Sequence, residues 1–414
     1  MPVFRRLRYV AAVLAVAVPA AGCSADQPEG PAASDVGVTA EPCPEAVNPN
    51  HGCIYLGMIS DLGTGPYGDV GRPATEGAEA FWRQVNEDGG IGVYDVDAGT
   101  FVRDGKYNAE LHFAAYRSLK GQVLAFAQSL GPATPAAMLD DLRRGGIVAV
   151  PVLADSGADF RPELLESGAS ACVSGMTAVD AAGEGRVLTV RTSDAYAGDA
   201  AAGARAAAQR RGLPYDELRT DDPADAIAEI AGSGAATVVL AVPPEDSVTI
   251  VEGLASRDFA GDVYGAGPAW TSDMLRNGAV IDRYALADPR AVDTESPGYA
   301  ALVDRLREDG VRDPSPGHVA GWVAQYPLKA ALERAATGSR LTRATLLRAA
   351  GALQTADFQG LLPQQAADQR RGRAYRAAAV TRPDPDRAGA TRTVQALREG
   401  STATGHIFDR PCAG

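Results

Sequence analysis

Residues 54–68 read Ile-Tyr-Leu-Gly-Met-Ile-Ser-Asp-Leu-Gly-Thr-Gly-Pro-Tyr-Gly, an apolar run followed by a glycine-rich loop. The run is typical of a buried strand, and Gly63, Gly65 and Gly68 have the GxGxxG spacing of dinucleotide-binding sites. Pro66 stands inside that turn, the following helix is expected to begin only near Arg72, and the next strand ends far more than ~20 residues later. The spacing therefore predicts a strand, loop and helix without a dinucleotide site.

Outward from this stretch, short apolar runs alternate with helical patterns, which is typical of βα units in a parallel sheet. Strands of a first sheet are expected at 54–59, 111–115, 123–127 and 147–150, with helices at 74–87 and 135–144. Strands of a second sheet are expected at 187–190, 237–242 and 262–265, with helices at 199–210, 224–230 and 246–256. Further helices are expected at 298–308 and 318–336. The pattern predicts two α/β lobes.

The N-terminus carries an export signal. Arg5, Arg6 and Arg8 precede an apolar run at 10–18, which is shorter than the ~20 residues that span a bilayer. Ala20-Ala21-Gly22-Cys23 follows and resembles a bacterial lipobox, although Ala20 stands where Leu is usual. We expect residues 1–23 to be a lipoprotein signal peptide with lipidation at Cys23, and the chain to be held at the outer face of the cytoplasmic membrane. The alternative is a plain secretory signal with an incidental cysteine.

Residues 24–45 are polar and rich in Pro, Ala, Ser and Gly, so we expect a flexible tether. About 370 residues remain, enough for two lobes of ordinary domain size. The net charge of the whole chain is −13, without a basic stripe. This argues against nucleic-acid partners and against electrostatic membrane binding, which leaves the lipid anchor as the membrane contact. A monomer is expected.

Four cysteines remain after Cys23, an even number that in an oxidising compartment indicates two disulfides with three alternative pairings. We favour Cys43–Cys53, a short loop before the first strand, and Cys172–Cys412, which would fix the C-terminal tail. Free buried thiols are the alternative.

Catalytic and metal-binding patterns are absent from the sequence. It contains no GxSxG, HExxH, P-loop or CxxC motif. Its histidines are far apart and lack metal-ligand spacing: His51, His112, His318 and His406. We therefore expect no metal, no cofactor and no enzymatic activity.

Several segments together resemble the branched-chain amino-acid binding proteins of ABC importers, which are type I periplasmic binding proteins with the leucine-binding fold. The segments lie within residues 54–365: 61–68, 71–73, 86–92, 127–131, 194–199 and 321–334. The resemblance implies two doubly wound, Rossmann-like lobes, joined by three crossings of the chain, with ligand in the cleft between them. It places the first part of lobe 1 at 46–176, lobe 2 at 177–288, the return to lobe 1 at 289–381, and an unmatched C-terminal tail at 382–414.

The cleft is expected at the carboxyl ends of the strands. Thr134-Pro135 looks like a helix start, so the free N–H groups from Gly131 to Ala136 would suit a carboxylate, and Ser129 could add a hydroxyl. A capped helix with nothing bound is the alternative.

The resemblance also implies cleft positions elsewhere in the chain. It places Ala154, Asp155 and Ser156 at the amino-acid head and Tyr196 and Trp322 as cleft aromatics, with Tyr67 and Trp270 as further candidates. Core packing is the alternative for each aromatic residue.

One departure from the family concerns the ligand's ammonium group. Relatives hold it with a glutamate at a position that falls on or near Gly267, where this chain has no acid. A buried ammonium without a carboxylate partner costs several kcal/mol. Either Asp155, Glu245 or Asp246 substitutes, or the ligand has no ammonium. A second departure is the short link 177–186, where relatives have a full helix, so we expect lobe 2 to have lost or shortened an element.

We therefore expect a lipoprotein that binds a small polar solute, amino-acid or amide-like, and delivers it by hinge closure to an ABC permease with its ATPase subunits. Leucine-like amino acids, short amides or urea, and small aromatic acids all remain open as ligands. Two other functions remain open as well: a sensor of the same fold that signals to a membrane receptor, and a structural lipoprotein that binds no ligand.

Overall fold

The computed structural model describes residues 35–131, 136–267, 269–338, 340–370 and 375–413. The expected signal peptide, the lipidation site Cys23, and Thr134 with Pro135 lie outside these residues. The described residues belong to one compact unit of the chain, residues 31–414.

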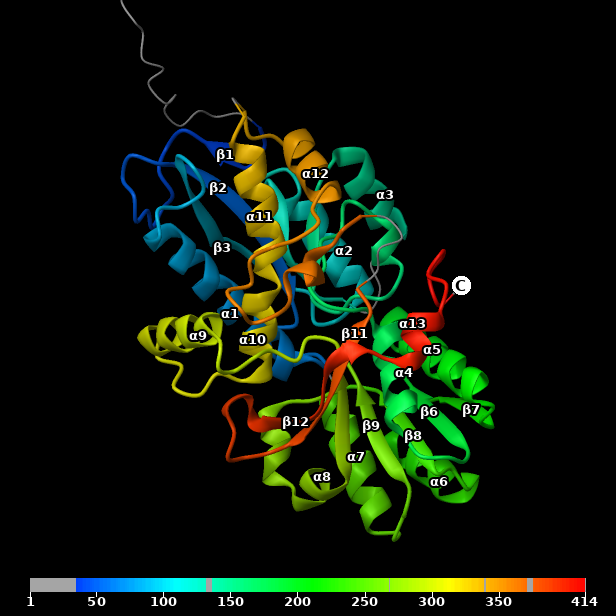
Figure 1. Cartoon of the computed structure of the whole chain (residues 1–414). Helices are drawn as coiled ribbons and strands as arrows, with labels where there is room; N and C mark the ends of the chain where they lie inside the picture. Colours follow the sequence, from blue (N-terminus) through cyan, green and yellow to red (C-terminus); the bar gives the residue numbers. More distant parts are fainter. Residues whose placement is uncertain (1–34, 132–135, 268, 339, 371–374, 414) are drawn as a thin grey trace, which may run out of the picture. The chain divides into compact units, whose positions relative to one another are not determined.

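The first sheet is built around β2 (Gly52–Ser60), which contains the apolar run expected as a strand (Figure 1). β2 pairs in parallel with β3 (Tyr94–Asp104) and β4 (Ala125–Ser129), and β4 pairs in parallel with β5 (Ala149–Pro151). β1 (Val38–Thr39) pairs antiparallel with β2, so part of the expected tether 24–45 belongs to the folded lobe.

Helices cover both faces of this sheet. One face packs on a core that includes α1 (Gly68–Glu87) and the later helices, namely α9 (Pro297–Glu308), α10 (Pro316–Val323), α11 (Gln325–Ala336) and α12 (Arg343–Gly351). The other face packs on α2 (Ala109–Leu119) and α3 (Ala136–Gly145). α1 and α10 can approach closely because Gly77 and Gly321 have no side chain at their contact. A Cβ at Gly77 would overlap the carbonyl of His318, and one at Gly321 would overlap that of Ala74.

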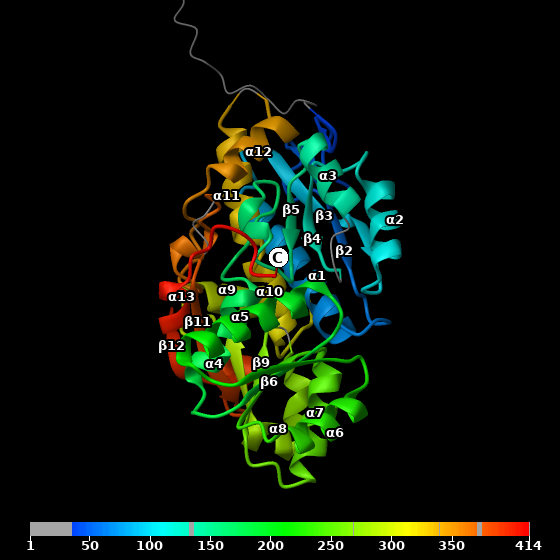
Figure 2. The ribbon, with the colours of Figure 1, turned by 90° about the vertical axis from the view of Figure 1, so that its right-hand side faces the viewer.

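The second sheet has the order β12-β11-β10-β9-β8-β6-β7. The strands β6 (Val187–Arg191), β7 (Tyr215–Arg219), β8 (Thr237–Ala241), β9 (Asp262–Ala266) and β10 (Tyr284–Asp288) are parallel. The hairpin of β11 (Ala377–Pro383) and β12 (Thr391–Glu399) extends the sheet antiparallel beyond β10 (Figure 2).

Helices also cover both faces of the second sheet. α4 (Ala171–Ala181), α5 (Ala195–Arg211) and the short α13 (Ser401–Gly405) contribute to the core on one face. α6 (Pro223–Ser233), α7 (Pro244–Ala255) and α8 (Gly278–Arg283) contribute to the core on the other. The element order takes the chain from the first lobe to the second, back through α9–α12, and again into the second lobe at β11.

The structure corrects several sequence-based expectations. Residues 111–115 belong to helix α2, whose N-cap Asn108 accepts the N–H groups of Glu110 and Leu111, and the strand in that part of the chain is β3. The link 177–186 contains the second half of helix α4, so no helix is lost there. Residues 377–381, expected in lobe 1, and part of the tail 382–414 form the hairpin on the second sheet.

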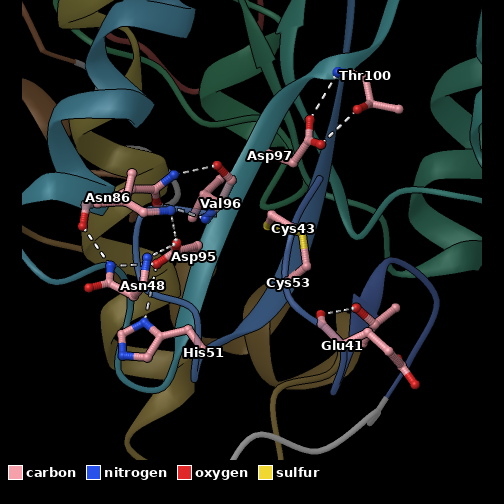
Figure 3. Close-up of a disulfide and its surroundings, with 12 residues drawn as sticks. Glu41, Cys43, Asn48, His51, Cys53, Asn86, Asp95, Val96, Asp97 and Thr100 are labelled. Carbon is pink, nitrogen blue, oxygen red and sulfur yellow. Dashed lines mark hydrogen bonds and ion pairs between the residues drawn. A yellow bond between two sulfur atoms is a disulfide. The ribbon is translucent and has the colours of Figure 1, made fainter. Parts of the chain in front are cut away.

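Both expected disulfides are present, Cys43–Cys53 and Cys172–Cys412. Beside the first, Asp95 of β3 is fully buried and accepts the N–H groups of Val47 and Asn48, both at 2.9 Å (Figure 3). Its other oxygen accepts a hydrogen bond from Asn48 Nδ2 at 2.7 Å and lies 3.2 Å from His51 Nδ1. One buried carboxylate therefore organises the loop that leads into β2.

Candidate ligand-binding site

Ser129 ends β4 at the expected edge of the sheet, but its hydroxyl already has a partner. Its Oγ lies 3.0 Å from Nε2 of His112, which projects from α2. Burial lowers the pKa of His112 to about 4, so the imidazole is neutral at physiological pH. Gly131 packs against the same ring, because a Cβ there would lie 2.8 Å from Nδ1. Ser129 and Gly131 thus form a buried contact with a neutral histidine.

The loop after β5 is held by internal hydrogen bonds. The Ala154 carbonyl accepts the Ala171 N–H at 3.1 Å, and Asp155 Oδ1 accepts the Gly157 N–H at 2.8 Å. Burial raises the pKa of Asp155. These contacts serve the backbone at the first passage between the lobes, so the expected ligand-binding groups of this loop are occupied.

Ser156 joins this loop to the second lobe. Its N–H and Oγ–H donate to the two oxygens of Asp199 in α5, at 2.8 and 2.5 Å, and its Oγ accepts the Cys412 N–H at 2.7 Å. Asp199 also accepts the Cys172 N–H at 2.9 Å. Burial raises the pKa of Asp199 to about 6. Ser156 and Asp199 therefore connect the lobes and the disulfide-bound tail.

Tyr67 and Tyr196, both expected in the cleft, are buried and lie close enough to influence each other. Tyr67, at the start of α1, packs its ring 4.3 Å from that of Tyr107. Its pKa is raised by burial and then by Asp194 and Tyr196 of the second lobe. The pKa values of both tyrosines are thus raised by burial and by the nearby Asp194.

Tyr196 also explains the absence of an acid at Gly267. A Cβ at Gly267 would overlap the Tyr196 hydroxyl, and Gly267 has a φ of +77°, which side chains rarely adopt. The Gly267 N–H donates to Ser174 Oγ at 3.1 Å. No side chain can extend from this position while Tyr196 keeps its place.

A cavity of about 410 Å³ lies beside these residues, with walls from both lobes. This volume falls in the range of ~300–1,000 Å³ that is usual for small-molecule sites. Lobe 1 contributes Val70, Val152, Val319 and Val323, and lobe 2 contributes Gly267, Trp270, Leu286 and Thr381. Asp288 and Arg290, at the second passage between the lobes, complete this part of the wall.

Asp288 and Arg290, the charged residues of this passage, are both held by hydrogen bonds. Asp288 Oδ1 accepts the Arg290 N–H at 2.8 Å, and Arg290 Nη1 donates to the Val152 carbonyl at 2.8 Å. Burial raises the pKa of Asp288, and Arg290 opposes that shift. Arg290 therefore ties the loop after β5 in lobe 1 to the end of β10.

Of the expected site residues that the structure describes, Trp270 lines the cavity, whereas Tyr67, Tyr196 and Trp322 do not. Trp322 is 1% exposed, packs edge-on against Phe81 at 5.2 Å, and donates from Nε1 to Tyr326 Oη at 3.2 Å. The expectation that it faces the cleft is wrong, because α10 turns its tryptophan into the core and its smaller Val319 and Val323 towards the cavity.

None of the acids proposed to replace the missing glutamate lines the cavity. Glu245 is exposed in the first turn of α7, and the half-buried Asp246 has a pKa raised by burial and then by Glu245. Sequence reasoning missed Asp288, Arg290 and Thr381. Charged residues at the end of an apolar run were the available signal for the first two, whereas nothing in the sequence indicated that Thr381 joins the second sheet.

Two further features of the described residues concern metal ions and membranes. Potential metal ligands cluster at Cys172, Asp199 and Cys412, but the two sulfur atoms are already joined in a disulfide. Within the same ranges, no helix combines the length and the apolar character that crossing a bilayer requires.

Comparison with known proteins agrees with this architecture. The family model described as periplasmic binding protein matches residues 54–390. No curated protein matches the chain.

Among solved structures, the fatty acid ABC transporter substrate-binding protein from Thermomonospora curvata has a TM-score of 0.80 and 22% identity, covering 91% of this chain and 99% of that one. A branched-chain amino acid ABC transporter protein from Thermus thermophilus with bound valine has a TM-score of 0.72 and 15% identity, covering 85% and 98%. The binding protein LivJ from Streptococcus pneumoniae with isoleucine has a TM-score of 0.66 and 15% identity, covering 83% and 100%.

These likenesses support the two-lobed fold of the type I binding proteins. The family consists of binding proteins, which agrees with the expectation that the chain is not an enzyme. With its family match over residues 54–390, the chain belongs to the periplasmic binding protein family.

Proposed function

We propose that this chain is the exported, lipid-anchored solute-binding protein of an ABC importer, and that it captures a small polar solute between its lobes by hinge closure. The family match supports solute binding, and the similar structures from Thermomonospora, Thermus and Streptococcus all belong to transporters by their descriptions. The acylated residue would be Cys23, and the partners would be a permease and its ATPase subunits.

The single observation that carries this proposal is the cavity whose walls come from both lobes. Val152 and Val319 contribute from the first lobe, and Trp270 and Thr381 from the second. A solute that touches both walls gains contacts that only the closed arrangement offers, so it shifts the population towards closure. The permease then distinguishes loaded from empty protein by this closure.

The named ligands of the similar structures have shared chemistry. A fatty acid, valine and isoleucine each join a carboxylate to an apolar body, and only the amino acids add an ammonium. Burying that ammonium requires a partner. In this part of the cavity wall the acid is Asp288, and the positive charge of Arg290 balances that of its carboxylate.

A thermal-shift screen of the unacylated mature protein tests the proposal, using amino acids, amides, urea, and aliphatic and aromatic carboxylates. A ligand at 100 times its Kd should add about 2.7 kcal/mol to the free energy of unfolding, and the melting temperature rises accordingly. Absence of stabilisation by every solute class would contradict the proposal.

A matched pair of variants locates the binding site. Ala320 lines the cavity from α10, and Ala330 is a similarly half-buried alanine on α11 away from it. Ala320→Phe should abolish the ligand-induced rise in melting temperature by filling the cavity, whereas Ala330→Phe should retain it. An equal response in both variants would place the solute elsewhere.

A further inference from the structure

Two buried polar atoms of the cavity wall have no hydrogen-bond partner among the described residues: Trp270 Nε1 and Thr381 Oγ1. The two residues are 4% and 2% exposed. An unsatisfied buried donor is costly, and native proteins rarely keep one without a water or ligand to receive it. Two residues of the cavity wall thus each carry a buried donor for which the described residues supply no acceptor.

Both donors lie on the same face of the second sheet. Thr381 of β11 is the direct antiparallel partner of Leu286 in β10, and opposite residues in such a pair share a face. Tyr284 lies two residues earlier on the same face, and the Trp270 ring stacks on it at 6.3 Å. Leu286 lines the cavity together with the two donors.

The opposite wall is apolar. Val70, Val152, Val319 and Val323 contribute to it from the first lobe, and each of them is less than a tenth exposed. A solute that filled the cavity would therefore lie between these aliphatic side chains and the lobe 2 residues Trp270 and Thr381, which carry the two unpartnered donors.

The charges of the lining favour an anion over a cation. Three arginines line the cavity, the partly buried Arg290 and the exposed Arg387 and Arg392, and Arg392 pairs with Asp384. Asp288 faces Arg290 and already accepts a backbone N–H, and the exposed Glu295 is the other acid of the lining. The indole N–H is a donor only, so the solute group that meets it must be an acceptor.

We propose that the cavity takes a carboxylic acid with an apolar chain and no ammonium group, its carboxylate accepting hydrogen bonds from Trp270 and Thr381 and its chain lying on the lobe 1 valines. A carboxylate has about four acceptor positions, enough for both donors. This inference rests on the proposed function and narrows its solute class. Tyr196, by filling the space in front of Gly267, leaves no side chain there to receive an ammonium.

Isothermal titration calorimetry with three probes of equal chain length tests this inference. Hexanoate carries the carboxylate alone, norleucine adds the ammonium, and hexanamide replaces the charge by a neutral amide. We expect hexanoate to bind at least about ten-fold more tightly than either of the others, because norleucine would bury an ammonium group without a partner and hexanamide lacks the charged acceptor. Tighter binding of norleucine than of hexanoate would overturn the inference.

Variants assign the two donors. Thr381→Val removes the hydroxyl at nearly constant shape, and Trp270→Phe removes the indole N–H together with part of the ring; each should weaken hexanoate binding at least about ten-fold. Thr177→Val is the matched control, because Thr177 of α4 is another buried hydroxyl without a partner among the described residues and does not line the cavity. Unchanged hexanoate affinity in both donor variants would overturn the assignment and would indicate that waters satisfy these atoms.

The outcomes also separate the two levels of inference. If norleucine or an amide binds, and Ala320→Phe abolishes that binding, the solute-binding function stands and the carboxylic-acid assignment fails. If no solute class binds to the wild-type protein, both fail.

Discussion

The Tyr196 hydroxyl lies where a side chain at Gly267 would begin. Tyr196 comes from the first turn of α5, and Gly267 directly follows β9, so the contact joins two neighbouring strand-to-helix connections of the second lobe. The 7% exposure of Tyr196 shows that its ring is held in this place. The Tyr196 ring and a side chain at position 267 thus cannot occupy this space together.

A double-mutant cycle tests this arrangement. Gly267→Ala should lower the free energy of unfolding by about 1–3 kcal/mol, because it overpacks a filled site. The same change in a Tyr196→Ala background should cost less, which leaves only the strain of a positive φ. Urea unfolding of the four proteins gives the coupling energy. Strict additivity would show that the ring can move aside freely.

Much of the fold could be predicted because strongly apolar strands dominate it. β2, β6, β8 and β9 carry continuous apolar runs, and their predicted positions agree with the structure to within about two residues. β3 escaped prediction because its sequence begins Tyr-Asp-Val-Asp, and aspartate is depleted in strands. Tertiary structure explains the exception, since Asp95 is the acceptor for the loop at 47–51.

The run at 111–115 was misread because a short apolar segment cannot by periodicity alone be assigned to a strand rather than a helix. The N-cap Asn108 was the available signal. The cavity could not be predicted from local sequence at all. Val152, Trp270, Val319 and Thr381 are far apart in the chain, and Thr381 reaches the cavity only because β11 joins the second sheet.

Asp95→Ala should destabilise the N-terminal loop. The variant removes the acceptor of the Val47 and Asn48 N–H groups and of Asn48 Nδ2 (Figure 3). A hydrogen bond to a charged acceptor contributes about 1.5–3 kcal/mol, so a loss of several kcal/mol is expected. Limited proteolysis with mass spectrometry should show new cleavage at 44–51. Asp97→Ala is the control, because the hydrogen bonds of the Asp97 carboxylate go to the exposed turn at Gly99 and Thr100. In this control, residues 44–51 should remain protected from the protease.

Asp199 should make stability depend on pH. Burial raises its folded pKa to about 6 from the usual 3.8, so the folded state binds this proton more tightly than the unfolded state does. The resulting stabilisation is present below pH ~4 and is lost as the pH rises through about 6. Its size is roughly 3 kcal/mol, from two pKa units.

Urea unfolding of the wild-type protein between pH 4 and 8 should therefore show a free energy of unfolding that falls as the pH rises. Asp199→Asn should lack this part of the fall. Ser156→Ala should steepen the dependence, because the Ser156 hydrogen bonds hold the pKa of Asp199 down. A slope in Asp199→Asn equal to that of the wild type would assign the titration to another group.

The two disulfides should differ in their contribution to stability. Cys43–Cys53 closes a separation of 10 residues, and Cys172–Cys412 one of 240 residues. The chain-entropy relation gives about 3 kcal/mol for the short loop and about 5 kcal/mol for the long one. The pair variant Cys172→Ser/Cys412→Ser should therefore melt at a lower temperature than Cys43→Ser/Cys53→Ser.

The long disulfide has a second effect, because the tail it fixes donates the Cys412 N–H to Ser156 across the lobes. Releasing the tail removes that contact, so lobe opening should become easier as well. Small-angle X-ray scattering without solute should show a larger radius of gyration for Cys172→Ser/Cys412→Ser than for Cys43→Ser/Cys53→Ser. Equal radii would mean that Ser156 and Asp199 hold the lobes together without the tail.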